Sequence, residues 1–177
     1  MRRLFVLLLL GLSRFAGASD WPDLPPDSVV LMRHALAPGG GDPAEFKLDD
    51  CNTQRNLSQE GREQAQRIGR AFAERGVKVG AVWSSQWCRT RETADLAFPG
   101  QRQDQPTFNS FFGSPASEEA QTRAALAQLQ TWRGPGVLVV ITHQVNITAL
   151  TGVVPESGSG VVLQPQVGGL KLIGRLP

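Results

Sequence analysis

Residues 28–40 read SVVLMRHALAPGG, and this stretch is the starting point for predicting the fold. Its apolar, partly β-branched run over residues 28–32 predicts a short buried strand. The run ends abruptly at Arg33 and His34, and a loop rich in Gly and Pro follows. Because the chain has only two histidines, one placed directly behind an arginine at the end of a buried strand is a candidate functional residue.

Strand and helix patterns alternate along the rest of the chain. A long polar loop is expected over residues 35–55, and helices are expected over residues 56–76, 86–98, 114–132 and 144–152. Strands are expected over residues 77–84, 105–108 and 136–142, and residues 160–176 predict two strands joined by a turn at Gly168 and Gly169. The alternation predicts an α/β domain with a mainly parallel sheet covered by helices on both faces.

The N-terminal segment predicts a secretory signal peptide. Residues 1–18 contain basic residues near their start, a short apolar run and a final Ala-Gly-Ala cleavage pattern. The apolar run is too short to span a bilayer comfortably, and an uncleaved anchor is the alternative. We therefore expect residues 1–18 to be removed and residues 19–177 to form one domain. The mature chain is expected to cross the inner membrane and reach the periplasm.

Export changes how the charge and the cysteines are interpreted. Cleavage after Ala18 leaves 15 basic and 16 acidic residues, so the precursor's pI of about 8.8 does not indicate binding to nucleic acid or membranes. Cys51 and Cys88 are the only cysteines, and an even count in an oxidising compartment favours a disulfide between them. Two buried free thiols are the alternative. A zinc site is not expected, because no two Cys or His ligands lie close together in the sequence.

Both histidines lie at the carboxyl ends of predicted strands. His34 follows Arg33 at the end of the first strand, and His143 follows the most hydrophobic run of the chain. Another predicted strand leads into Arg89 within a few residues. Ligands of such sheets bind beyond the carboxyl ends of the strands, so we expect these four side chains to surround one site.

Two arginines and two histidines are suited to phosphoryl transfer. Guanidinium groups are planar, permanently charged forks that match phosphate oxygens. Positive charge nearby lowers the pKa of an imidazole and keeps it neutral, so that it can attack phosphorus and form a covalent intermediate. A second histidine can donate to the phosphoryl oxygens, and arginine charge removes the need for a metal ion.

Four segments resemble motifs of the histidine phosphatase (phosphoglycerate mutase-like) superfamily, and the chain resembles a small exported member. The segments are LMRHA at residues 31–35, NLSQEGREQAQRIG at residues 56–69, VWSSQWCRTRETA at residues 82–94 and VLVVITHQ at residues 137–144. Their order and spacing agree with that family from about residue 29 to residue 150.

The resemblance implies a fold and a set of site residues. The fold would be a three-layer α/β/α sandwich around a mixed, mainly parallel sheet. His34 would be the phosphorylated nucleophile, while Arg33, Arg89 and His143 would bind the phosphate and complete the pocket. The resemblance implies neither a metal nor another cofactor.

The group that protonates the leaving group is the point where this chain departs from the family. One branch carries a Glu after the second arginine, and another carries an Asp directly after the second histidine, where this chain has Gln144. Glu118 and Glu119 are candidates, although a predicted helix start favours acidic residues for structural reasons. Further candidates without a family match are the acidic residues of the long loop, Asp42, Glu45, Asp49 and Asp50.

The sequence therefore predicts a metal-independent, exported phosphatase that forms a phosphohistidine on His34. Its substrate would be a small phosphomonoester or phosphoramidate, such as a phosphorylated sugar of the lipopolysaccharide core. Without a positioned acid, substrates with good leaving groups are favoured. The alternative is a non-catalytic module that binds phosphate or a phosphosugar on the same fold. A disulfide would tie the long loop to the segment of Arg89, a closure that contributes about 3 kcal/mol.

Overall fold

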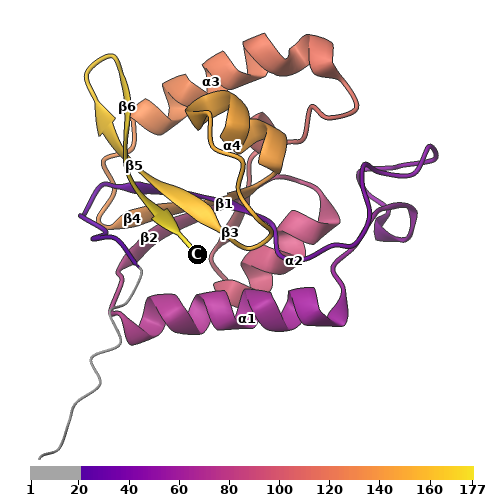
Figure 1. Ribbon diagram of the computed structural model, residues 1–177, viewed down its shortest axis with the longest axis horizontal. Coiled ribbons are helices and arrows are strands. Elements are labelled where there is room, and N and C mark those ends of the chain that lie inside the picture. The colour runs from indigo at the N-terminus through magenta and orange to yellow at the C-terminus, as the bar shows by residue number, and fades with distance from the viewer. Residues whose placement is uncertain (1–20) are drawn as a thin grey trace, which may run out of the picture.

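The architecture is a sheet flanked by helices, seen in a computed structural model that describes residues 21–177 (Figure 1). The expected signal peptide, residues 1–18, lies outside the described residues. The helices are α1 (Gln59–Glu74), α2 (Cys88–Ala97), α3 (Glu118–Gln130) and α4 (Gln144–Thr151). The strands are β1 (Val29–Arg33), β2 (Val79–Ser84), β3 (Arg102–Asp104), β4 (Val137–Thr142), β5 (Gly160–Gln166) and β6 (Gly169–Leu176).

The strands form one mixed sheet in the order β3-β2-β4-β1-β5-β6. β1 pairs in parallel with β4, β4 with β2, and β2 with β3, whereas β5 is antiparallel to both β1 and β6. β5 and β6 form the hairpin expected at the tail, and Gly168 in its turn has a φ of +82°, a left-handed conformation that favours glycine. The expected α/β fold with a mainly parallel sheet is confirmed.

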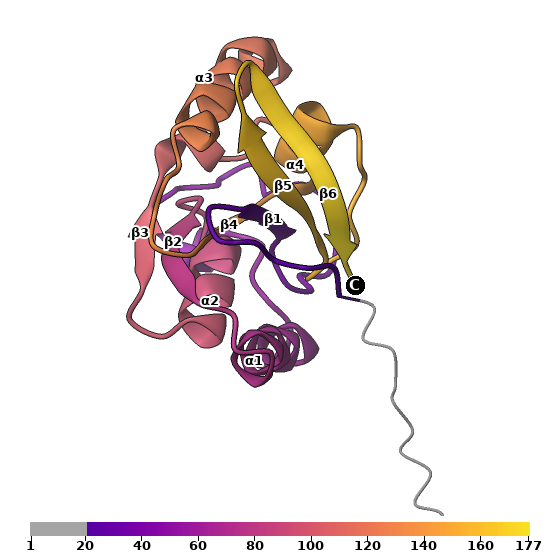
Figure 2. The same cartoon turned by 90° about the vertical axis from the view of Figure 1, so that its left-hand side faces the viewer.

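Helices cover both faces of the sheet, so the expected three-layer sandwich is also confirmed (Figure 2). Successive side chains of a strand point to opposite faces, and β1 shows this directly. Met32 belongs to the core cluster that contains Phe72 of α1. Leu31 belongs to the opposite cluster, together with Leu129 of α3 and Ile147 of α4. Since both faces of the central strands are buried, a polar site is left to the ends of the strands.

The prediction of a strand over residues 105–108 is wrong. The strand of this region is β3, which lies immediately upstream, and Pro106–Phe108 forms a 3-10 helix. Pro106 has no N–H to give to a sheet ladder, whereas its fixed φ suits the first position of a helical turn. The apolar character of the segment comes from Phe108, which is buried in the core cluster on the α3 side of the sheet.

Residues 35–55 form the long loop that the sequence predicts. The loop projects from the end of the molecule where β1 stops (Figure 1). Its one helical turn among the described residues is Cys51–Thr53, where the Asp50 side chain accepts a hydrogen bond from the N–H of Asn52. After the loop, Ser58 caps α1 by accepting from the N–H of Gly61 at 3.0 Å. The loop therefore ends in a fixed position at the start of α1.

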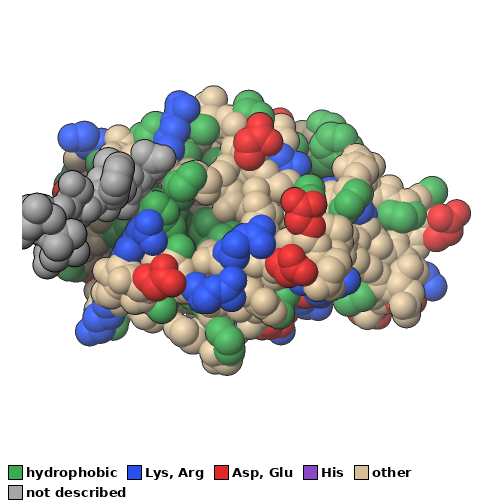
Figure 3. All heavy atoms as spheres, turned by 60° about the horizontal axis from the view of Figure 1, so that its bottom comes forward, with side chains coloured by type: hydrophobic (Ala, Val, Ile, Leu, Met, Phe, Trp, Pro, Cys, Tyr) green, Lys and Arg blue, Asp and Glu red, His purple; other side chains and the backbone are tan. Residues whose placement is uncertain are grey.

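Acidic and basic side chains are interspersed on the face seen when the α1 side comes forward (Figure 3). Helix α1 contributes residues of both signs to the surface, among them Glu63 and Arg67. Within residues 21–177, none of the helices has the length and apolar character needed to cross a membrane.

Gly69 allows α1 and α2 to approach closely. A methyl group at Gly69 would lie 2.2 Å from the carbonyl oxygen of Ala97, a backbone atom at the end of α2. We predict that Gly69→Ala destabilises the chain by about 1–3 kcal/mol, because overpacking outweighs the gain of about 1 kcal/mol in helix propensity. Urea denaturation measures the loss, and Gln66→Ala on the exposed side of α1 is the control. Equal stability of the two variants would show that the helices separate without loss of packing.

Candidate active site

Three neighbouring strands end at the same edge of the sheet and bring the predicted residues together. β4 lies between β2 and β1, and Arg33 at the end of β1 is paired with Thr142 at the end of β4. His34 and His143 follow these paired residues, and their ring centroids lie 5.6 Å apart. The backbone N–H of His34 donates to the carbonyl of Thr142 at 3.0 Å, so the two histidines are held at the same level of the sheet.

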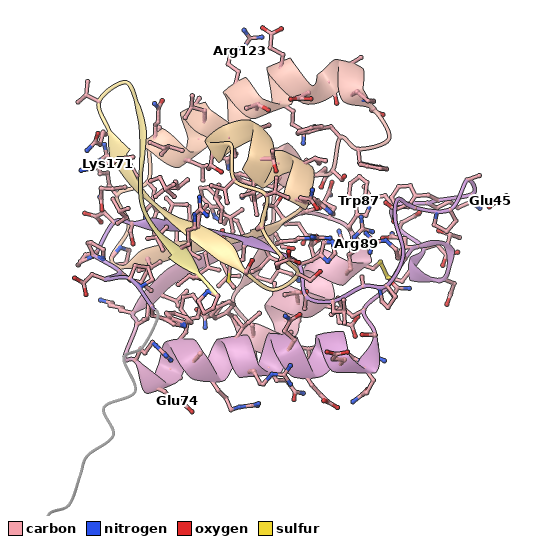
Figure 4. All side chains as sticks on the ribbon, in the orientation of Figure 1. Glu45, Glu74, Trp87, Arg89, Arg123 and Lys171 are labelled. Atoms are coloured by element: carbon pink, nitrogen blue, oxygen red, sulfur yellow. A yellow bond between two sulfur atoms is a disulfide. The ribbon has the colours of Figure 1, made fainter. Side chains whose placement is uncertain are left out.

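Helix α2 places Arg89 against both imidazole rings. The helix starts shortly after β2, and Arg89 in its first turn is only 3% exposed. Nε of Arg89 lies 3.2 Å from Nε2 of His34, and Nη2 lies 3.4 Å from Nδ1 of His143. Figure 4 shows Arg89 at the end of the molecule from which the long loop projects. The structure thus brings together the four residues that the sequence predicts.

These four residues line a cavity of about 160 Å³. The long loop and the segments after β3 and β4 supply the rest of the lining, which consists of Gly39, Gly40, Gly41, Asp42, Arg55, Ser110, Phe112, Gln144 and Val145. The charged groups are three arginines and one carboxylate, so the pocket carries net positive charge when its histidines are neutral. Such a pocket attracts anions.

His34 is a neutral imidazole with a lone pair facing Arg89. Its Nδ1 lies 2.7 Å from the carbonyl oxygen of Ala35, which can only accept a hydrogen bond, so Nδ1 carries the proton. Nε2 then carries the lone pair and accepts from the Arg89 Nε–H. Burial lowers the pKa of His34 to about 3; the charge of Arg89 acts in the same direction and the Ala35 bond opposes it. Nε2 is therefore unprotonated at neutral pH, and it can act as a nucleophile once a bound ligand takes over the Arg89 donor.

His143 is buried beside Ser85, whose Oγ lies 2.8 Å from Nε2 of the ring. Burial, together with the charge of Arg89, lowers the pKa of His143 well below its ordinary value. The Ser85 hydroxyl can donate or accept, so it permits two neutral tautomers of the ring. His143 can therefore present Nδ1 as an acceptor to Arg89 or as a donor to a bound oxyanion.

Arg33 lines the cavity and leaves one of its donors without a partner among the described residues. Its Nη1 donates to the carbonyl of Pro155 at 3.1 Å, while its buried Nε has no acceptor among residues 21–177. Arg55 is a third arginine of the pocket that sequence reasoning missed as a site residue. Its Nε donates to the carbonyl of Gly41 at 2.8 Å, and its Nη1 donates to the carbonyl of Ala37. Its position directly before the motif at residues 56–69 could have identified it.

Asp42 pairs with Arg89 in the pocket. Its Oδ1 accepts from Nη1 of Arg89 at 2.6 Å and its Oδ2 accepts from Nη2 at 3.1 Å. The indole N–H of Trp87 donates to Oδ2 at 2.9 Å. Burial alone would raise the pKa of Asp42, but the hydrogen bonds from Arg89 and Trp87 outweigh it, and the pKa is lowered. The carboxylate is therefore ionised at neutral pH.

The other acidic candidates do not line this cavity. Glu118 and Glu119 lie at the start of α3 and border a separate hollow of the surface. The remaining loop acids also lie outside the lining, namely Glu45, Asp49 and Asp50. In Figure 4 the labelled Glu45 is at the far tip of the loop, away from Arg89. Within residues 21–177, no three Cys, His, Asp or Glu side chains are grouped so that they could hold a metal ion.

The two cysteines form the expected disulfide. Cys51 and Cys88 are bonded and are separated by 37 residues in the sequence. The bridge joins the end of the long loop to the residue before Arg89. Gln54 supports the same junction, because its Oε1 accepts from the Cys88 N–H at 2.9 Å and its Nε2 donates to two loop carbonyls, those of Lys47 and Leu48. The loop that carries Asp42 is thus fastened to the helix that carries Arg89.

We predict that removing the bridge weakens both the fold and the site. For a closed loop of 37 residues the chain-entropy model gives about 4 kcal/mol, somewhat more than the value of about 3 kcal/mol expected from the sequence. The double variant Cys51→Ser, Cys88→Ser should lose a similar free energy of unfolding, measured in urea, and should bind inorganic phosphate more weakly. The wild-type chain treated with a reductant is the parallel sample. Unchanged stability and phosphate affinity in both would refute an organising role for the disulfide.

The buried histidines also predict acid sensitivity. The pKa of each is lower in the folded chain than the unfolded value of about 6.5, so the unfolded chain binds more protons below that pH. Their contribution to stability is complete above about pH 6.5 and falls with decreasing pH, by up to about 1.4 kcal/mol per pH unit for each histidine. Denaturation curves at a series of pH values measure the slope. His143→Gln should flatten it, whereas the exposed Arg123→Gln should not; parallel curves would contradict the assignment.

A family model matches the part of the chain that carries the first three motifs. The model describes the histidine phosphatase superfamily, branch 1, and matches residues 29–110. No curated protein sequence gives a significant match to the chain.

Solved structures share the fold over most of their length. SixA of Agrobacterium tumefaciens, named as a phosphohistidine phosphatase, is 21% identical with a TM-score of 0.57, over 86% of this chain and 98% of that chain. The mycobacterial glucosyl-3-phosphoglycerate phosphatase is 18% identical with a TM-score of 0.57, over 77% and 89%. The phosphoserine phosphatase of Entamoeba histolytica, solved with 3-phosphoglyceric acid, is 13% identical with a TM-score of 0.61, over 85% and 96%. At these identities the likeness establishes a common fold.

Proposed function

The chain belongs to the histidine phosphatase superfamily, and from that premise we propose that it is a phosphatase that works through a phosphohistidine on His34. The observation that carries the proposal is the state of His34. Its unprotonated Nε2 lies 3.2 Å from Nε of Arg89, in a cavity lined by three arginines. A neutral nucleophile and a cluster of anion-binding groups thus share one pocket, as phosphoryl transfer requires.

Two displacements at phosphorus make up the proposed reaction. Nε2 of His34 attacks phosphorus, the bond to the leaving oxygen or nitrogen breaks, and the leaving group departs with the electron pair and takes a proton from solvent. Water then attacks phosphorus, the N–P bond breaks, and Nε2 regains its lone pair while a proton goes to solvent. The guanidinium of Arg33 and the edge of Arg89 that faces the histidines stabilise the phosphoryl oxygens in both steps.

The proton balance of the pocket favours substrates whose leaving group needs little help from a protein acid. Asp42 is ionised, and both histidines are neutral near pH 7. The leaving groups of phosphoramidates, acyl phosphates and activated phosphoesters depart readily under these conditions. The proposed substrates are therefore small phosphoramidates or phosphomonoesters, and the structurally similar SixA is itself named for phosphohistidine.

For the natural substrate we propose a phosphorylated sugar of the cell envelope, such as a sugar phosphate of the lipopolysaccharide core. Its hydroxyl is a poorer leaving group than those above, so its leaving oxygen has to take a proton from solvent as it departs. The support is the predicted export to the periplasm and the uncharged part of the pocket lining. Ser110, Phe112 and Gln144 offer a hydroxyl, an aromatic ring and an amide, which suit a neutral group that carries hydroxyls. Another similar structure is named as a phosphatase of a glucosyl-3-phosphoglycerate.

Hydrolysis of 4-nitrophenyl phosphate by the purified mature chain tests the proposal. We expect turnover that persists in EDTA, because the arginines supply the charge that a metal would otherwise provide. His34→Ala should lower kcat by at least about 1,000-fold, as expected for loss of a nucleophile. Arg123→Gln, on the exposed face of α3, is the control.

The same experiment separates the alternatives. Labelled phosphate that remains on the wild-type chain after alkaline denaturation, and is absent from His34→Ala, would identify the intermediate. Equal turnover by wild type and His34→Ala would refute the assignment of His34. Binding of inorganic phosphate without any turnover would favour a non-catalytic phosphate-binding module. An active chain is then compared on phosphoramidates and sugar phosphates.

A further inference from the structure

Asp42 lies in the pocket but outside the motifs that identify the family. It is the one acidic residue among those that line the cavity, and it comes from the long loop. We propose that Asp42 is a positioning residue, which holds Arg89 so that one edge of its guanidinium faces the phosphoryl group of the substrate. The proposal rests on the phosphatase function proposed above and adds a residue to the machinery of that site.

The guanidinium of Arg89 divides its donors between two edges. At its end, Nη1 and Nη2 bind the two oxygens of Asp42 at 2.6 and 3.1 Å. Along its side, Nε and Nη2 face Nε2 of His34 and Nδ1 of His143 at 3.2 and 3.4 Å. The side edge is the one that faces the nucleophile. Because Nη2 carries two hydrogens, a carboxylate and a phosphoryl group can bind the two edges at once.

Asp42 also stabilises the crowded positive charge. Arg89 lies close enough to Arg33 and Arg55 that its charge acts to lower the pKa of both. In the absence of the carboxylate, Nη1 of Arg89 would keep only the carbonyl of Arg55, at 3.4 Å. A buried cation that faces two other cations and lacks an anionic partner turns away from them, since desolvation and repulsion act in the same direction. The bidentate pair therefore fixes both the place and the rotation of the guanidinium.

The carboxylate is held on its other side as well. The indole N–H of Trp87 donates to Oδ2 of Asp42, and the Trp87 ring stacks on Phe46 of the same loop with 5.0 Å between centroids. Arg55 donates to the carbonyl of Gly41, the residue before Asp42, at 2.8 Å. The Asp42 side chain is 18% exposed. In Figure 4 Trp87 and Arg89 lie together where the loop meets the body of the molecule. Asp42 thus has a fixed position from which to orient Arg89.

The contacts of Asp42 favour positioning over proton donation. Its oxygens accept from three N–H groups, two of Arg89 and one of Trp87, and each of these bonds stabilises the ionised form. A proton donor has to carry a proton when the leaving group departs. With the carboxylate ionised and both histidines neutral, the charges lining the pocket leave a net charge of +2, which matches the dianion of a phosphomonoester.

A double-mutant cycle tests whether Asp42 acts through Arg89. The four proteins are the wild type, Asp42→Asn, Arg89→Lys and the double variant. For each protein, kcat/KM is measured with 4-nitrophenyl phosphate and with phenyl phosphate, whose leaving group is poorer. The affinity for tungstate, an oxyanion that is not hydrolysed, is measured by calorimetry. Asp42→Asn should lower kcat/KM by about 10- to 100-fold for both esters, the effect of losing a charge-assisted bond. In the Arg89→Lys background the same change should have an effect below about 3-fold, because a lysine has no planar guanidinium for Asp42 to orient.

Each outcome of the cycle has one meaning. The positioning role is overturned if Asp42→Asn lowers kcat/KM equally in both backgrounds or in neither. It is also overturned if kcat/KM falls only for the ester with the poorer leaving group. In each of these cases, activity of the wild type leaves the phosphatase function standing. If the wild type binds tungstate without turnover, the phosphatase function fails and the cycle in tungstate affinity decides the positioning role. A wild type that neither hydrolyses esters nor binds tungstate overturns both.

Trp87→Phe is a second variant that does not alter the charge of the site. It keeps a ring against Phe46 and removes the indole donor to Asp42. We expect it to lower kcat/KM by about 2- to 10-fold in the wild type. In the Arg89→Lys background its effect should be smaller, as for Asp42→Asn. Thermal melting of each variant confirms that it is folded. An additive effect of Trp87→Phe would contradict a chain of contacts from Trp87 through Asp42 to Arg89.

Discussion

The backbone pairing of β1 with β4 is the constraint on which the rest of the site depends. Both strands are buried, and the register that sets Arg33 against Thr142 also sets His34 beside His143. A slip by one residue would turn the side chains of β1 to the opposite faces of the sheet and exchange Leu31 with Met32 between the two cores. The packing of the hydrophobic core on both faces of the sheet therefore fixes the positions of the two imidazoles, although neither ring belongs to the core.

Burial and positive charge act together on that geometry. Each lowers the affinity of the histidines for protons, so the rings stay neutral beside three arginines without a compensating carboxylate of their own. The arginines are less easily accommodated, and the fold supplies backbone carbonyls of Pro155, Gly41 and Ala37 together with the carboxylate of Asp42 in the pocket lining. Among the described residues, Nε of Arg33 is left without an acceptor, and three arginines line the pocket, in agreement with the oxyanion binding proposed above.

The sequence predicts those parts of the structure that are written in local patterns. Runs of apolar residues identify β1 and β4, and the residues directly after each run identify the two histidines and Arg33. The prediction of a strand over residues 105–108 is wrong, because Phe108 is buried in the core without being part of a strand and Pro106 prevents strand pairing. Helix-start acids mislead in a similar way, since Glu118 and Glu119 lie where a helix favours acids and border another hollow.

Parts of the site that depend on loop geometry are not predictable in this way. Asp42 and Arg89 are 47 residues apart, and the loop that carries Asp42 has no periodic pattern that would place it beside Arg89. The disulfide supplies what periodicity does not, since it fixes the loop next to Arg89. The nucleophile is placed by the sheet, whereas the anionic partner of Arg89 is carried by a loop that the disulfide helps to fasten. Reduction of the two thiols removes one link between the loop that carries Asp42 and the helix that carries Arg89, so the redox state of the cysteines is coupled to the geometry of the pocket.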